Sequence, residues 1–101
     1  MQSDDRALQR AKILSETARI PWRELQRFFA SGAVVAVAAG LDLVEVACAM
    51  AEDDGERVAA WMGAGQVVPA SDGQARDWYE ADRMMWAVVL SPFVLVQPIE
   101  E

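Results

Sequence analysis

The chain contains no histidine and no asparagine, and only one lysine, one threonine and one cysteine. Without histidine there is no His general base and no Ser-His-Asp or Cys-His arrangement. Zinc sites, which draw mainly on cysteine and histidine, are excluded as well. A lone cysteine forms no internal disulfide, which is typical of a reducing compartment. We therefore expect a cytoplasmic protein that holds no cofactor and no metal.

Long apolar runs that could cross a membrane are also missing. Residues 33–51 are mostly apolar, but Asp42 and Glu45 interrupt them, and acids at a bilayer centre are costly. The run over residues 84–96 is too short to span a bilayer, and Pro92 breaks it. The polar N-terminal residues contain no apolar stretch of the kind that a signal peptide needs. We expect no membrane partner.

Basic residues are scarce, with nine against sixteen acidic ones, and the net charge is −7. Such a charge repels nucleic acid, so we expect no nucleic-acid partner. The charge is uneven along the chain. Residues 1–32 hold six bases and four acids, which gives +2, and residues 33–101 hold three bases and twelve acids, which gives −9. A basic arm on an acidic body indicates self-complementarity, either within one chain or between chains.

The patterns that are present favour one α+β domain over residues 1–101, because helical and strand signals intermingle without a linker or repeat. We expect a small mixed sheet of three to four short strands packed against four to five helices. Continuous apolar runs predict strands at residues 33–39, 66–69, 85–90 and 93–97. The second of these is expected at a sheet edge, because Pro69 cannot donate to a ladder.

Apolar spacing and capping residues predict the helices. They are expected at residues 4–18, at residues 22–31, at residues 42–52, after the turn at residues 53–56, and after a cap at residue 71 or 72. Pro21 either ends the first helix or opens the second at its first position. The first helix has a thin apolar stripe of Ala7, Ala11, Leu14 and Ala18 on a polar background, so we expect residues 1–18 to be peripheral. The third is nearly all apolar, which is typical of a buried helix.

Three acids are candidate ligand-binding residues, namely Asp42, Asp53 and Asp82. Asp42 followed by Glu45 favours a capping box over a catalytic carboxylate pair. Asp53 belongs to an acidic cluster that could hold Mg²⁺ or Ca²⁺, but the cluster lacks the spacing of a calcium loop and favours a helix cap. Asp82 lies close in the sequence to aromatic residues of the last predicted helix. A hydrogen bond from a Trp N–H or a Tyr hydroxyl of that helix would explain an acid at this position. The alternative for Asp82 is a ligand-facing acid.

Four tryptophans in so short a chain are a further candidate feature. Trp61 and Trp78 could line an aromatic pocket for a base, a sugar or a cation. Both fall on the inner stripe of a predicted helix, and Trp86 falls within a predicted strand, so the pattern favours core packing. Cys48 lies inside the apolar helix, which favours a buried structural thiol over a reactive one.

Several segments together resemble a small bacterial family described as domain of unknown function 2288. They are residues 16–25 (ETARIPWREL), residues 41–47 (LDLVEVA), the pair Asp53 and Asp54, Trp61 followed by Gly65, Trp78, residues 86–89 (WAVV) and residues 93–97 (FVLVQ). Residues 1–14 lie outside this shared pattern. The resemblance implies a bacterial cytoplasmic setting and brings no activity, cofactor or catalytic residue with it.

The leading hypothesis for function is a non-enzymatic, self-associating domain that acts through protein contacts, as a homo-oligomer, most simply a dimer, or with another protein. Two apolar sheet faces, exposed strand edges and the uneven charge favour it. The alternative is a small-ligand binding protein with an aromatic pocket rimmed by Asp42, Asp53 or Asp82. An enzyme is the third hypothesis, and carboxylates with a divalent metal would be its only chemistry.

Overall fold

The centre of the fold is a five-stranded sheet with the strand order β1-β4-β5-β2-β3. The computed structural model describes residues 2–100, with side chains from Asp5 onward. β5 runs parallel to β2, and all the other strand pairs are antiparallel. The strands are β1 (Ala18–Pro21), β2 (Val34–Val37), β3 (Val67–Pro69), β4 (Met84–Leu90) and β5 (Phe93–Pro98). The fold is thus the expected α+β class with a mixed sheet.

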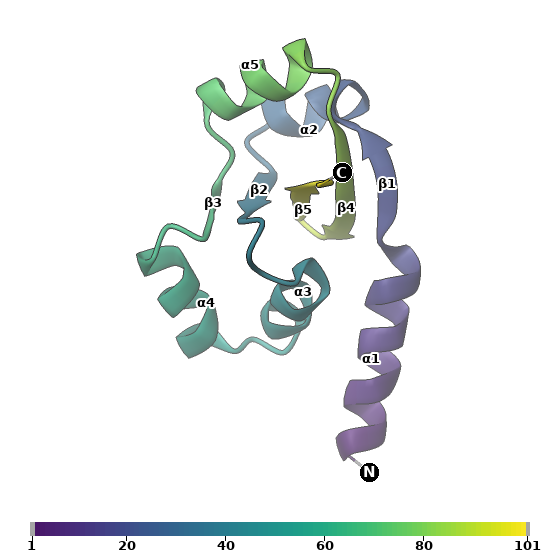
Figure 1. Cartoon of the computed structure of the whole chain (residues 1–101). Helices are drawn as coiled ribbons and strands as arrows, with labels where there is room; N and C mark the ends of the chain where they lie inside the picture. Colours follow the sequence, from purple (N-terminus) through teal and green to yellow (C-terminus); the bar gives the residue numbers. More distant parts are fainter. Residues whose placement is uncertain (1, 101) are drawn as a thin grey trace.

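Helices cover both faces of this sheet (Figure 1). One face, here called the first core, packs against the 3-10 turn η1 (Trp22–Leu25), α2 (Gln26–Ala30) and α5 (Asp72–Glu80). The other face, the second core, packs against α3 (Leu43–Ala51), with Trp61 of α4 (Gly55–Gly63) and Ile13 of α1 (Gln2–Glu16) at its margins. Each face of the sheet is therefore apolar and each is covered by the same chain.

The sheet has one strand more than the three to four expected, because β1 was not predicted. The helical spacing extends the first helix to Ala18, whereas α1 ends at Glu16 and the chain turns extended at Ala18. Pro21 is the last residue of the strand and the N-cap of η1, one position before the first helical position predicted for it. The residue before a proline is biased toward extended backbone. Pairing of Ala18 with Ala87 and of Ile20 with Met85 completes the strand.

α3 confirms the prediction of a buried helix that begins after Asp42. The Asp42 carboxylate accepts hydrogen bonds from the backbone N–H groups of Val44 (2.9 Å) and Glu45 (3.4 Å). The Glu45 side chain does not complete the capping box, because it pairs with Arg57 instead. Asp42 therefore caps α3 with its side chain and satisfies two N–H groups that the helix itself cannot bond.

Later capping signals are confirmed too. Ser71 and Gln74 form a reciprocal capping box at the start of α5. β3 ends at Pro69 and is an edge strand, as the proline indicated. These features follow from neighbours in the sequence, so the pattern alone was sufficient to place them.

α1 extends away from the sheet past α3 and gives the molecule dimensions of 46 × 28 × 27 Å (Figure 1). Among its described side chains only Ile13 is buried, at 5% exposed. Two ion pairs join the helix to the acidic body: Arg6 to Glu52 and Arg10 to Asp42, each at 3.4 Å. The basic arm therefore docks on the acidic part of its own chain.

Replacing Asp42 by alanine should lower the free energy of unfolding by about 1 kcal/mol, because α3 loses its N-cap. Asp42→Asn is the matched control, since asparagine keeps an acceptor for the same backbone N–H groups. Urea denaturation of both variants and of the unaltered protein measures the difference. Equal stability of the alanine variant and the unaltered protein would show that the cap contributes nothing.

Candidate functional site

The residues singled out by the sequence do not converge on one site. Asp42, Asp53 and Asp82 line three separate hollows of the described surface. Trp78 is 9% exposed in the first core, and Trp61 packs half-buried against the second. The three acids therefore do not share one of these hollows, and each candidate has its own surroundings.

Asp53 and Asp54 form the turn between α3 and α4. Asp53 has φ of 60°, in the left-handed region that aspartate tolerates better than most residues. The Asp54 carboxylate accepts from the backbone N–H of Arg57 (3.4 Å) and caps α4, as expected for one of this pair. Among the described side chains, from Asp5 to Glu100, no three Asp, Glu or Cys residues come close enough together to hold a metal ion. Capping and turn geometry account for these acids.

Thermal unfolding should not depend on divalent metal. Melts recorded with excess Mg²⁺, Ca²⁺ or Mn²⁺ should agree with melts in chelator to within ~2 °C, because a ligand stabilises a fold only by binding the folded state. A larger rise with one of the three ions would reveal a specific site and would favour the metal-dependent enzyme hypothesis.

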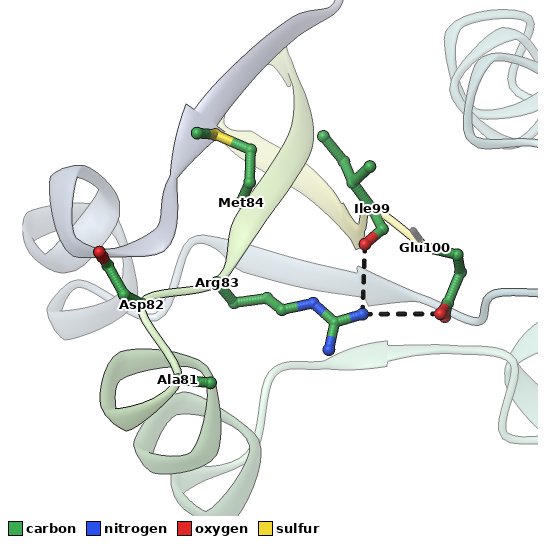
Figure 2. Close-up of a pocket in the computed structure, with 6 residues that line it drawn as sticks. All are labelled: Ala81, Asp82, Arg83, Met84, Ile99 and Glu100. Carbon is green, nitrogen blue, oxygen red and sulfur yellow. Dashed lines mark hydrogen bonds and ion pairs between the residues drawn. The ribbon is translucent and has the colours of Figure 1, made fainter.

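Asp82 follows α5 at φ of 51° and lies beside an open polar hollow (Figure 2). Its carboxylate is turned away from Arg83 and pairs instead with Arg23, at 3.6 Å. The expected hydrogen bond from a Trp N–H or a Tyr hydroxyl is not made. Arg83 closes the other side of the hollow, donating to the Ile99 carbonyl (3.3 Å) and pairing with Glu100 (3.6 Å). The charges here are paired with one another.

The tryptophans divide between core and surface. Trp78 stacks edge-on against Trp22, with ring centroids 4.9 Å apart, and Trp22 donates its indole N–H to the Ala75 carbonyl (3.0 Å). These contacts confirm core packing for Trp78. Trp86 was expected in the core and is not there, since 38% of it is exposed. Tyr79 of α5 is 46% exposed, with the Arg23 guanidinium over its ring.

Trp86 lines a hollow that we call the α1–β4 cavity. It is a hollow of about 280 Å³ between the end of α1, the start of α3 and the strands β4 and β5. Its lining is mostly apolar and consists of Leu14, Thr17, Asp42, Leu43, Val44, Trp86 and Gln97. Of the five residues singled out by the sequence, only Asp42 lies here. Small clefts with an apolar lining and few polar groups are the usual form of a ligand site.

Gln97 is the buried polar residue of this cavity, at 9% exposed. Its amide nitrogen donates to the carbonyls of Ala38 and Leu41, each at 2.7 Å, which ties the loop before α3 to β5. Trp86 is its direct neighbour across the β4–β5 ladder. Sequence reasoning missed both residues as site candidates. The signal available was a single polar side chain at the end of the apolar run over residues 93–97.

Cys48 lies on α3 and packs half-buried against the second core. Burial raises the pKa of the Cys48 thiol, and the positive charge of Arg10 opposes this only in part. The raised pKa keeps the group as a neutral thiol at neutral pH, so it is a poor nucleophile.

Cys48 should react several-fold more slowly with a thiol reagent at pH 8 in the folded protein than in denaturant. The reason is that the thiolate is the reactive form, and the raised pKa lowers its fraction. The rate in the folded protein should rise as the pH is increased further. Equal rates in folded and denatured protein would contradict burial of this side chain.

The outer side of α1 carries a second feature, which we call the apolar band: Ala7, Leu8, Ala11 and Leu14. All four side chains are exposed, Leu8 at 70% and Leu14 at 59%. With 3.6 residues per turn they share a sector of about 120°. The opposite side of the helix, with Arg6, Arg10 and Ile13, contacts the body of the protein. The sequence predicted three of the four residues of the apolar band, and in the structure the band faces solvent.

The fold and its two surface features together define a single α+β domain with a helical arm, an apolar cavity at the base of the arm and an exposed apolar band along it. The chain belongs to the family described as protein of unknown function DUF2288, whose sequence profile matches residues 8–98. The family match thus begins within α1, earlier than the resemblance indicated.

The chain is also similar to a solved bacterial protein, the NMR solution structure of PA1075 from Pseudomonas aeruginosa. The two are 50% identical, with a TM-score of 0.82, over 93% of this chain and 87% of that one. No curated protein matches the chain. None of the described helices has the length and apolar character needed to cross a membrane.

Proposed function

We propose that the protein is a non-enzymatic, self-associating domain and that two copies pair through the apolar band of α1. One observation carries the proposal: α1 contacts the rest of the protein through the side that carries Arg6 and Arg10, and its apolar band faces solvent. An amphipathic helix normally buries its apolar stripe against the core. A helix with the reverse orientation exposes a surface that a partner would cover.

Charge favours a second copy as that partner. The net charge of −9 on residues 33–101 opposes contact between the bodies of two molecules, whereas residues 1–32 carry +2. The apolar band itself holds no ionisable side chain. Two copies could therefore meet along residues 7–14 of α1 without bringing the two acidic bodies against each other. A symmetric pair that uses the same patch twice is the commonest form of homo-oligomer.

The sheet itself offers less support for pairing than the sequence indicated. Most of both faces is covered within the chain, and only parts of β4, at Trp86 and Val89, remain exposed, so neither face requires a neighbour over its whole area. Its edge strands are β1 and β3, and each is short and ends in a proline, Pro21 or Pro69. Short edges with proline resist pairing with another chain. The proposed interface therefore lies on the helix.

The double variant Leu8→Gln, Leu14→Gln should convert a dimer into a single chain, because it removes the two largest side chains of the apolar band. Light scattering after gel filtration, over a range of micromolar concentrations, gives the mass directly. Met62→Gln is the matched control, since Met62 is an exposed apolar residue (53%) on α4, away from the band. This control should remain a dimer.

Two results would overturn the proposal. One is an unaltered protein with the mass of a single chain at every concentration. The other is a dimer that survives the double substitution, which would place the interface elsewhere.

We also propose a bacterial cytoplasmic location and no cofactor or nucleic-acid partner. The lone cysteine and the net charge of −7 support these points.

Small-ligand binding is the second candidate function, and the α1–β4 cavity is the observation that favours it.

A further inference from the structure

We propose that the α1–β4 cavity binds a small neutral carboxamide that carries an apolar body. The proposal goes beyond self-association and does not depend on it. It rests on an oriented, accessible acceptor in the largely buried Gln97 side chain, on apolar walls from three different elements, and on ion pairing that leaves no unpaired charge among the lining residues.

The acceptor is the side-chain oxygen of Gln97. The amide nitrogen is committed to the carbonyls of Ala38 and Leu41, at 2.7 Å each, so the oxygen cannot exchange places with it. No described donor bonds to this oxygen, and no buried polar side-chain atom among the described residues is without a partner. The oxygen is therefore accessible, and it belongs to a residue that lines this cavity. It is a fixed acceptor for an N–H group.

The walls provide a surface for an apolar body. Leu14 comes from α1, Leu43 and Val44 come from the first turn of α3, and Trp86 comes from β4. The volume of about 280 Å³ lies near the lower end of the range for ligand cavities, which favours a small molecule. An aromatic or branched aliphatic group would replace water against these side chains.

The charges at the rim favour a neutral ligand. Asp42 is the ionisable residue of the lining, and its carboxylate already caps α3 and pairs with Arg10 at 3.4 Å. The Arg19 guanidinium lies over the ring of Trp86, 5.7 Å from its centroid. Arg19 is not part of the lining, so a charged ligand would find no unpaired counter-ion among the lining residues, which is costly in an apolar hollow. A carboxamide offers N–H groups to Gln97 and its own oxygen to a donor such as the indole N–H of Trp86.

Three probes of one skeleton separate the ligand classes: 2-phenylacetamide, phenylacetate and phenethylamine. Each is titrated into the isotopically labelled full chain, and NMR follows the Gln97 side-chain amide and the Trp86 indole N–H. The amide should shift both signals saturably, with at least about tenfold tighter binding than the acid or the amine. Equal or tighter binding of the acid or the amine would overturn the ligand class. A lack of saturable shift with all three would overturn the site.

A pair of variants tests the location. Trp86→Ala removes one wall and should weaken amide binding by at least about tenfold. Val89→Ala, on the opposite face of the same strand and 60% exposed, should leave the affinity unchanged. Equal loss in both variants, or in neither, would contradict the proposal.

A further measurement keeps the test independent of variant stability. In the unaltered protein, nuclear Overhauser contacts should join the phenyl protons of the amide to Trp86 and to the Val44 methyls, and their absence would overturn the site. Light scattering gives the mass of each sample and so shows whether a single chain or a dimer is present. Failure of ligand binding can then be told apart from failure of self-association.

Discussion

The rest of the structure depends on β5 being buried on both of its faces. Val94 and Val96 point into the first core and Leu95 into the second, and none of the three is more than 3% exposed. A strand of this kind needs cover from both sides. Short helices supply it, α5 with η1 on one side and α3 on the other. Parallel pairing of β5 with β2 fixes where α3 begins, and therefore where Asp42 and the cavity lie.

Once α3 covers the second core, little apolar surface remains for α1 to bury. Ile13 is its one buried side chain among those described, and its other anchors are exposed ion pairs through Arg6 and Arg10. Exposed pairs of this kind contribute about 0–1 kcal/mol each. α1 is therefore held less firmly than the helices under the sheet, and salt weakens its attachment. Because α1 makes so few contacts with the rest of the protein, its apolar band faces solvent.

Local signals were sufficient for much of the fold, and the misses share one physical cause. The caps at Asp42 and Ser71, the buried α3 and the edge strand at Pro69 all follow from neighbours in the sequence. β1 was missed because four residues become a strand only by pairing with β4, far along the chain. Exposure of Trp86 and burial of Gln97 were missed for a similar reason. Which part of a sheet face a helix leaves open depends on tertiary packing, and periodicity does not encode it.

Gln97 connects the fold to the cavity. An apolar residue in its place would remove the donor that the carbonyls of Ala38 and Leu41 share. The Ala38 carbonyl would keep its bond from the Leu41 N–H, whereas the partly buried Leu41 carbonyl would lose its side-chain donor, which is costly. That structural need accounts for the amide nitrogen, and it also fixes the direction of the oxygen, which remains open beside Trp86. Leu14 then belongs to both surface features, since it lines the cavity and ends the apolar band. Because α1 is weakly held, the position of this one helix determines both the shape of the cavity and the surface that a second copy would meet.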